Sequence, residues 1–164
     1  MPKLIILIGL PSSGKSFLAD KISQLFDYIK ISIDEIRKRL NIRLGDFSQH
    51  QLLFQITYNK IEQTLKYYNI VYDATNIDLN YRLKFLGSMY SKATLIGIFV
   101  NTPYATCLLR NSQKISSETV PMRLMQEMHA LLLGQTLLQL SAQFDYFFEV
   151  FGNEKEVIKF VQNL

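Results

Sequence analysis

Short apolar runs alternate with longer amphipathic segments along the chain. The runs are rich in β-branched and aromatic residues, a composition that is typical of buried strands. They cover Leu4–Ile8, Tyr28–Ser32, Ile70–Tyr72, Leu95–Val100 and Tyr146–Phe151. Because helical segments separate the runs, we expect a five-stranded parallel sheet with helices on both faces, which is a three-layer α/β sandwich.

The amphipathic segments predict the helices. They cover Lys15–Phe26, Ile33–Leu40, Gln49–Tyr68, Asn80–Tyr90, Pro103–Arg110 and Pro121 to about Leu140. Pro103 and Pro121 stand where the first turn of a helix accepts proline. Asn153 is suited to cap a last helix, with Glu156 at its N3 position. The apolar face of that last helix would consist of Val157, Ile158 and Val161.

Two polar stretches interrupt the alternation, at residues 41–49 and 111–120. Both fit plain solvated loops, and loops of this kind beside a site also act as substrate rims and lids. No repeat, low-complexity tract or linker divides the sequence. We therefore expect one domain over residues 1–164, with a lid at about residues 111–121.

Composition narrows the class of protein only moderately. The formal net charge is +4, which is compatible with a polyanionic partner without requiring one. The single cysteine, Cys107, has no partner for an internal disulfide, and we expect it to pack as a small hydrophobe. The apolar start of the chain runs directly into a glycine loop, and no apolar stretch is long enough to span a bilayer. We expect a cytoplasmic protein with no membrane partner and no stable protein partner.

The stretch "GLPSSGKS", Gly9–Ser16, fits the phosphate-loop pattern G-x-x-x-x-G-K-[ST] between a predicted strand and a predicted helix. Its glycines allow the backbone to turn tightly, so that consecutive N–H groups and the positive end of the helix face an anion. Lys15 would neutralise the β- and γ-phosphates, and the Ser16 hydroxyl would bind Mg²⁺. The predicted nucleotide-binding residues of this stretch are Gly9, Leu10, Pro11, Ser12, Ser13, Gly14, Lys15, Ser16 and Phe17.

Acidic residues follow the second and third predicted strands at their carboxyl ends, where ligands of open parallel sheets bind. Asp34 is placed to accept a proton from a hydroxyl that attacks the γ-phosphate, and Arg37 lies one helical turn further on the same face. The alternative for this pair is an ordinary charge at a helix N-terminus with its i,i+3 partner. Asp73 ends the third strand and begins "DATN".

Arg110 and Lys114 flank the polar stretch "RNSQK". Cations on a mobile segment can close over the β- and γ-phosphates and stabilise the charge that develops during transfer. Basic residues in the last turn of a helix are also common without any such role. No guanine-reading N-K-x-D motif is present, and the pattern as a whole favours a phosphotransferase over a GTPase switch.

The stretches "GLPSSGKS", "SIDEIRK", "VYDATN" and "LLRNSQK" occur in this order. Together they resemble the 5′-kinase module of polynucleotide kinases, both the phage repair enzyme and the bacterial RNA end-healing enzymes. The similarity extends from Lys3 to about Val157, and its more specific features are the Asp34–Arg37 pair, "DATN" and "RNxxK". The resemblance implies an adenylate-kinase-like P-loop kinase fold with a helical lid, with ATP as donor and Mg²⁺ as cofactor.

The resemblance also implies a role for each matching residue. Asp34 would be the general base on a 5′-hydroxyl, and Arg37 would contact the phosphate on the 3′ side of the acceptor. Arg110 and Lys114 would be lid cations on the donor phosphates. The implied catalytic residues are Lys15, Asp34 and Arg110. The implied acceptor-binding residues are Asp34, Arg37, Asp73 and Asn76. A basic rim for nucleic acid 5′ ends would consist of Arg37, Lys38, Arg39 and Arg43.

The sequence departs from this family at two points. Lys114 stands where the relatives usually have arginine, and lysine does not make the planar bidentate contact. No phosphatase D-x-D-G-T motif or ligase module follows. Two alternatives therefore stay open beside a polynucleotide 5′-kinase: a kinase for a nucleoside or sugar derivative, and a nucleotide-binding ATPase without a phosphoryl acceptor.

Overall fold

The computed structural model describes residues 1–153, 155–156 and 159. Its centre is an all-parallel sheet of five strands in the order β2-β3-β1-β4-β5. The strands are β1 (Lys3–Ile8), β2 (Tyr28–Ser32), β3 (Asn69–Asp73), β4 (Thr94–Val100) and β5 (Tyr146–Val150). All five strands predicted from the apolar runs are confirmed, and each begins and ends within one residue of the predicted run.

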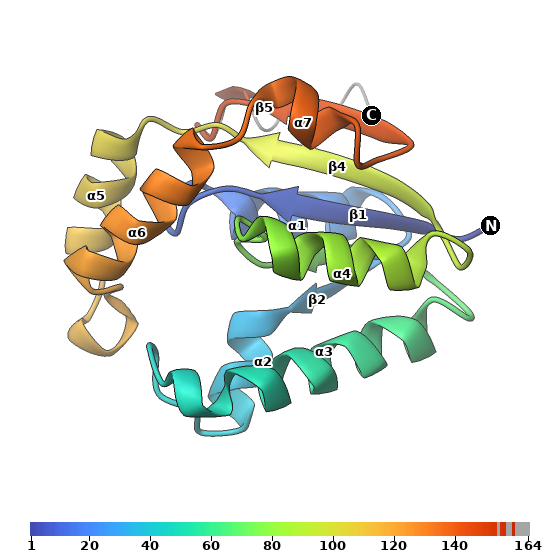
Figure 1. Cartoon of the computed structure of the whole chain (residues 1–164), viewed down its shortest axis with the longest axis horizontal. Coiled ribbons are helices and arrows are strands. Elements are labelled where there is room, and N and C mark those ends of the chain that lie inside the picture. Colours follow the sequence, from blue (N-terminus) through green and yellow to red (C-terminus); the bar gives the residue numbers. More distant parts are fainter. Residues whose placement is uncertain (154, 157–158, 160–164) are drawn as a thin grey trace.

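Helices connect the strands and cover the sheet (Figure 1). They are α1 (Lys15–Leu25), α2 (Ile33–Arg39), α3 (His50–Thr64), α4 (Leu79–Met89), α5 (Tyr104–Ser112), α6 (Met122–Leu133) and α7 (Leu137–Ser141). Two short 3₁₀ helices, η1 (Phe47–Gln49) and η2 (Ser116–Glu118), lie in the two polar stretches. Among the helices of the described part of the chain, none has both the length and the apolar character to cross a bilayer.

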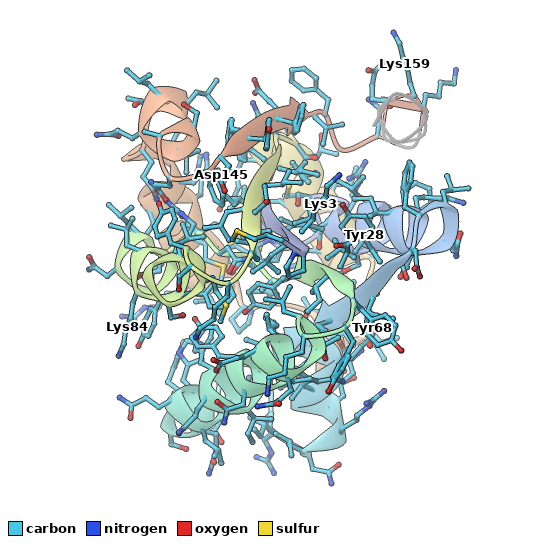
Figure 2. All side chains as sticks on the ribbon, turned by 90° about the vertical axis from the view of Figure 1, so that its right-hand side faces the viewer. Lys3, Tyr28, Tyr68, Lys84, Asp145 and Lys159 are labelled. Carbon is cyan, nitrogen blue, oxygen red and sulfur yellow. The ribbon has the colours of Figure 1, made fainter. Side chains whose placement is uncertain are left out.

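The central strand β1 is buried on both faces because its side chains alternate between two cores. Leu4, Ile6 and Ile8 pack on the side of α3 and α4. Ile5 and Leu7 pack on the other side, against α1. Figure 2, which looks along the strands, shows side chains filling the space between the sheet and the helices on either side of it. The predicted three-layer sandwich is therefore confirmed.

The prediction of one long helix from Pro121 to about Leu140 is wrong. The chain forms α6, stops at the C-cap Gly134, and begins again with α7 after Thr136. Thr136 accepts a hydrogen bond from the Gln139 N–H, and the Gln139 side chain accepts one from the Thr136 N–H. This capping box starts a new helix at a point where helical periodicity continues in the sequence.

Two other helix ends can be compared with the predictions. The helix predicted over Gln49–Tyr68 ends earlier, at Thr64. At the last predicted helix, the Asn153 side chain accepts a hydrogen bond of 3.0 Å from the Glu156 N–H, as expected of the cap. The apolar face predicted for that helix, Val157, Ile158 and Val161, lies outside the described residues.

Candidate active site

The phosphate loop joins β1 to α1 at the carboxyl edge of the sheet, and its backbone depends on two glycines and one strained serine. Gly14 and Ser12 both have positive φ angles, 104° and 64°. A Cβ atom on Gly9 would lie 2.8 Å from the Val100 carbonyl oxygen, so the loop passes too close to β4 for any side chain there. The two glycines of the predicted pattern are thus required by the local geometry.

Lys15 is held inside this loop and is only 7% exposed. Its Nζ donates to the Leu10 carbonyl oxygen over 2.6 Å and lies 3.4 Å from Ser13 Oγ. Burial lowers the pKa of Lys15 to about 8, although the carboxylates of Asp73 and Asp34 act in the opposite direction. The loop therefore presents a desolvated cation that gains from any anion placed beside it.

The Ser16 hydroxyl donates a hydrogen bond of 2.7 Å to Asp73 Oδ2 at the end of β3. Burial raises the pKa of the Asp73 carboxyl, while Lys15 and the Ser16 hydrogen bond lower it. A serine hydroxyl beside a carboxylate is a donor set that suits Mg²⁺ when nucleotide phosphates supply further oxygens. Among the described residues, no group of three or more histidine, cysteine, aspartate or glutamate side chains is arranged to hold a metal.

Lys30 is a charged residue of this region that the sequence analysis missed. It extends from β2, and its Nζ lies 2.8 Å from Asp20, 3.1 Å from Glu35 and 4.0 Å from Asp73 Oδ2. It thereby joins carboxylates from α1, α2 and β3 beside Ser16. A lysine in the otherwise apolar strand "YIKIS" is the signal that would have indicated it.

The proposed acceptor side begins at α2. The Asp34 side chain is 67% exposed, whereas only 10% of the Arg37 side chain is exposed. Arg37 Nε lies 3.3 Å from Asp34 Oδ1, and Arg37 Nη1 donates to the Ile42 carbonyl oxygen over 3.0 Å. The predicted i,i+3 pair is therefore formed, with the arginine buried and the carboxylate open to solvent.

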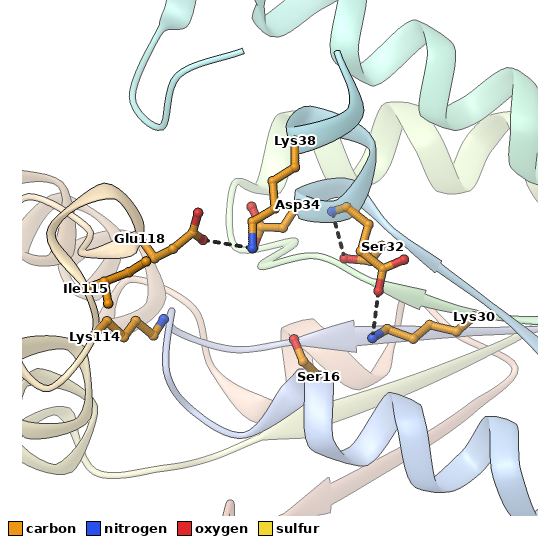
Figure 3. Close-up of a pocket in the computed structure, with 9 residues that line it drawn as sticks. Ser16, Lys30, Ser32, Asp34, Lys38, Lys114, Ile115 and Glu118 are labelled. Carbon is orange, nitrogen blue, oxygen red and sulfur yellow. Dashed lines mark hydrogen bonds and ion pairs between the residues drawn. The ribbon is translucent and has the colours of Figure 1, made fainter. Parts of the chain in front are cut away.

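A cleft of about 450 Å³ separates α2 from the phosphate loop. Figure 3 shows Asp34 and Lys38 entering it from α2, Ser16 from the start of α1, and Lys114 from the opposite wall. Its lining consists of Ser16, Lys30, Ser32, Asp34, Glu35, Lys38, Lys114, Ile115 and Glu118. The structure thus brings together four residues singled out in the sequence, Ser16, Asp34, Lys38 and Lys114, and the roles assigned to them remain predictions.

The segment from Asn111 to Val120, which we call the lid segment, forms the wall opposite α2. Asn111 is buried and closes its base, since its Nδ2 donates to the Val120 carbonyl oxygen and its Oδ1 accepts from the Val120 N–H. Within it, the Thr119 hydroxyl donates to the Ile115 carbonyl oxygen over 2.9 Å. Just before it, Arg110 Nη1 donates to the Ser12 carbonyl oxygen over 3.3 Å, so Arg110 contacts the phosphate loop.

Asn76, for which acceptor binding was predicted, follows β3 in the "DATN" loop, and that role stays a prediction. It does not line the cleft. Its Nδ2 donates to the Leu7 carbonyl oxygen of β1 over 2.8 Å, and its φ is 48°. Its carbonyl oxygen accepts from Arg82, a buried side chain that also donates to Gln143 Oε1. Asn76 and Arg82 therefore hold the "DATN" loop, a function for Arg82 that the sequence analysis missed.

The turn after β5 packs against the phosphate loop, as the sequence alone did not indicate. A Cβ atom on Gly152 would lie 1.9 Å from the Ser13 carbonyl oxygen and 2.0 Å from Thr102 Oγ1. Thr102 Oγ1 donates to the same Ser13 oxygen over 2.6 Å. Gly152 and Thr102 therefore determine where the loop backbone can lie.

Similar folds occur among solved kinases of several kinds. A putative kinase from Chloroflexus aurantiacus superposes with a TM-score of 0.75 at 14% identity, over 98% of this chain and 95% of that chain. The shikimate kinase from Acinetobacter baumannii superposes with a TM-score of 0.66 at 14% identity, over 99% and 90%. A chain of the Pnkp1/Rnl/Hen1 RNA repair complex superposes with a TM-score of 0.74 at 21% identity, over 88% and 47%. At these identities the likeness establishes the fold, which is that of the P-loop kinases.

The structural comparison gives the fold, and the comparison with family models gives the family. No curated protein matches the sequence significantly. The model of the AAA_33 family, described as an AAA domain, matches residues 4–134, which include the phosphate loop, α2, the "DATN" loop and the lid segment. The chain belongs to the AAA_33 family of AAA domains.

Proposed function

We propose that the chain transfers the γ-phosphate of ATP to a 5′-hydroxyl end of DNA or RNA. The observation that carries this proposal is the position of Asp34. Its carboxylate is exposed in the same cleft as Ser16, and Arg37 on the same helix lies 3.3 Å from it. An open carboxylate opposite a phosphate loop is suited to accept a proton from an attacking hydroxyl.

The donor half of the reaction belongs to the phosphate loop. Lys15 neutralises the β- and γ-phosphates. Ser16 and Asp73 would hold Mg²⁺, which would supply charge stabilisation on the phosphate oxygens. Arg110, which contacts the loop at Ser12, stabilises the charge that develops on the transferred group. Asp34 then removes the proton from the acceptor hydroxyl. The hydroxyl oxygen bonds to the γ-phosphorus as the bond between that phosphorus and the oxygen bridging to the β-phosphate breaks.

Two features support a nucleic acid as acceptor. The basic residues Arg37, Lys38, Arg39 and Arg43 lie on or just after α2, and Lys38 among them lines the cleft. Phosphate contacts by such residues supply most of the affinity of proteins for nucleic acid backbones. The similar chain of an RNA repair complex is the second feature, although this chain spans about half of that chain's length, 47%.

The test is transfer of labelled phosphate from ATP to 5′-hydroxyl oligonucleotides of DNA and of RNA. We expect labelling of at least one of them, and none of the same oligonucleotide carrying a 5′-phosphate. Asp27→Asn serves as a charge-matched control for substitutions of Asp34, because Asp27 is exposed and precedes β2 at the opposite edge of the sheet. Tight ATP binding without transfer to any oligonucleotide contradicts the proposal.

The size of the cleft favours a second candidate, a kinase for a small hydroxyl compound. Its volume of about 450 Å³ lies within the range of small-molecule sites. Shikimate kinase and a gluconokinase from Sinorhizobium meliloti share the fold over nearly their whole length. Nucleosides, sugars and other polyols belong in the same labelling assay, and transfer to one of them with none to oligonucleotides selects this candidate.

A further inference from the structure

A carboxylate of the lid segment contacts the basic residues of α2. Glu118 Oε2 lies 3.1 Å from Lys38 Nζ and 3.7 Å from Arg37 Nη2. Figure 3 shows the Glu118 side chain reaching from the lid segment across the mouth of the cleft to Lys38. The two walls of the cleft are therefore joined by an acidic group that faces the residues expected to bind the acceptor.

Two of the three nitrogens of the Arg37 guanidinium already contact groups of α2 or the residues after it. Its Nε faces Asp34 and its Nη1 donates to the Ile42 carbonyl oxygen. The remaining nitrogen, Nη2, is the one that faces Glu118. A carboxylate and a phosphate use the same charged hydrogen-bonding geometry on arginine. Glu118 therefore occupies the position at which a phosphate of the acceptor would contact Arg37.

Glu118 belongs to the lid segment, whose two ends are joined by hydrogen bonds. The two hydrogen bonds between Asn111 and Val120 join the ends of the lid segment, and the Thr119 hydroxyl bonds back to the Lys114 and Ile115 carbonyl oxygens. Lys114, which lines the cleft, belongs to the same segment. Glu118 and Lys114 therefore belong to the same closed segment, on the wall of the cleft opposite α2.

We propose that Glu118 is a specificity-determining residue that competes with an acceptor phosphate for Arg37 and Lys38. An acceptor with a phosphate beside its reactive hydroxyl must displace Glu118, whereas a neutral acceptor need not. The inference rests on the proposed function, in which Arg37 binds an acceptor phosphate. The Lys38 and Glu118 side chains are 54% and 32% exposed, so the contact is weak enough to exchange and opposes an anion by about two- to fivefold.

The test compares Glu118→Gln with the wild-type chain, using two ligands that differ by a single phosphate. Adenosine and adenosine 3′-monophosphate both have a free 5′-hydroxyl, and their affinities are measured with Mg²⁺ and a non-hydrolysable ATP analogue present. We expect Glu118→Gln to bind the monophosphate about two- to fivefold more tightly and adenosine unchanged. Glu127→Gln is the matched control, because Glu127 pairs with the exposed Arg123 on α6 and loses the same charge.

Three results overturn the proposal. One is equal tightening in Glu127→Gln, which indicates a general effect of net charge. Another is unchanged or weaker binding of the monophosphate by Glu118→Gln. The third is the absence of any preference for the monophosphate over adenosine in every variant. Failure of labelled transfer to oligonucleotides, with the binding difference present, instead contradicts only the polynucleotide acceptor.

A second measurement needs no acceptor. Hydrogen exchange of the amides of residues 114–120 reports how firmly the lid segment is held against α2 in the chain without ligands. We expect Glu118→Gln to accelerate this exchange, Lys38→Gln to accelerate it by no more than that because Arg37 still faces Glu118, and the double variant to match Glu118→Gln. Exchange that is unchanged in Glu118→Gln overturns the proposal, whatever the acceptor is.

Discussion

The proposed donor half of the site, which is the phosphate loop, and the proposed acceptor half are built in different ways. The donor half is a continuous stretch, Gly9–Ser16, in which Ser13 and Lys15 are buried and the backbone packs against β4 and Gly152. The acceptor half combines side chains from α2 and the lid segment, and its Asp34 and Lys38 are more than half exposed. One half is therefore rigid and local, and the other is open and assembled from distant segments.

On the proposed function, this difference follows from what each half has to recognise. The triphosphate is the same in every reaction of this type, so a loop whose backbone N–H groups are held by packing serves all of them. The acceptor varies, and exposed side chains on short elements can change without disturbing the fold. The solved kinases with this fold include shikimate kinase and a gluconokinase, so the same fold occurs in kinases with different names for their acceptors.

The largest effect is expected from Asp34→Asn, which removes the base and leaves the donor half intact. We expect kcat for transfer to fall about 10²- to 10⁴-fold while the Kd for ATP changes little. Steady-state transfer assays and equilibrium nucleotide binding measure the two quantities. A loss of ATP binding would show that the two halves are not separable, and an unchanged rate of ATP turnover would indicate an ATPase without an acceptor.

The next largest effect is expected from Gly152→Ala, which alters the donor half through packing alone. The added Cβ would lie 1.9 Å from the Ser13 carbonyl oxygen, and relief of such overpacking costs about 1–3 kcal/mol. We expect weaker ATP binding, by about five- to 150-fold, with acceptor affinity unchanged. Gly87→Ala is the control, since a Cβ there meets nothing within 4 Å; equal affinities in the two variants would contradict the role of Gly152.

A smaller, pH-dependent effect is expected from Lys15. Its pKa of about 8 means that the free chain holds this lysine protonated below pH 8 and increasingly neutral above it. Bound phosphates favour the protonated form, so nucleotide affinity should fall by up to tenfold per pH unit above about pH 8 and stay constant below it. Titrations of ADP in buffers of different ionisation enthalpy measure the proton uptake. A flat profile up to pH 9.5 would contradict this prediction.

The smallest effect is expected from Lys114→Arg in the lid segment. Arginine can make a bidentate contact with phosphate that lysine cannot, so ATP affinity or kcat should rise by about threefold or less. Lys66→Arg, at an exposed position after α3, provides the comparison because its only described side-chain bond is to Gln63. A decrease of tenfold or more in transfer would show that the cleft at Lys114 is too tight for arginine and that its contact is specific to lysine.

Much of this molecule could be predicted from the sequence because the signals are local. Apolar runs located every strand, and the glycine pattern located the phosphate loop and its lysine. The break between α6 and α7 was missed because helical periodicity continues through it, while a capping box at Thr136 decides the local conformation. The bond from Asn76 to β1 was not foreseen because it depends on the order of the strands, and the predicted acceptor role of Asn76 stays a prediction.

The sequence by itself determined the layered parallel sheet, the phosphate loop and the carboxylates at the ends of β2 and β3. The apolar pattern of a strand and the glycines of a tight turn are set by residues next to each other in the sequence. A short stretch of sequence is therefore enough to predict them. Only the tertiary structure placed Lys30 beside Asp73, Gly152 against Ser13, and Glu118 against Arg37. Each of these contacts joins segments far apart in sequence, and the packing of the sheet and helices decides which of them meet.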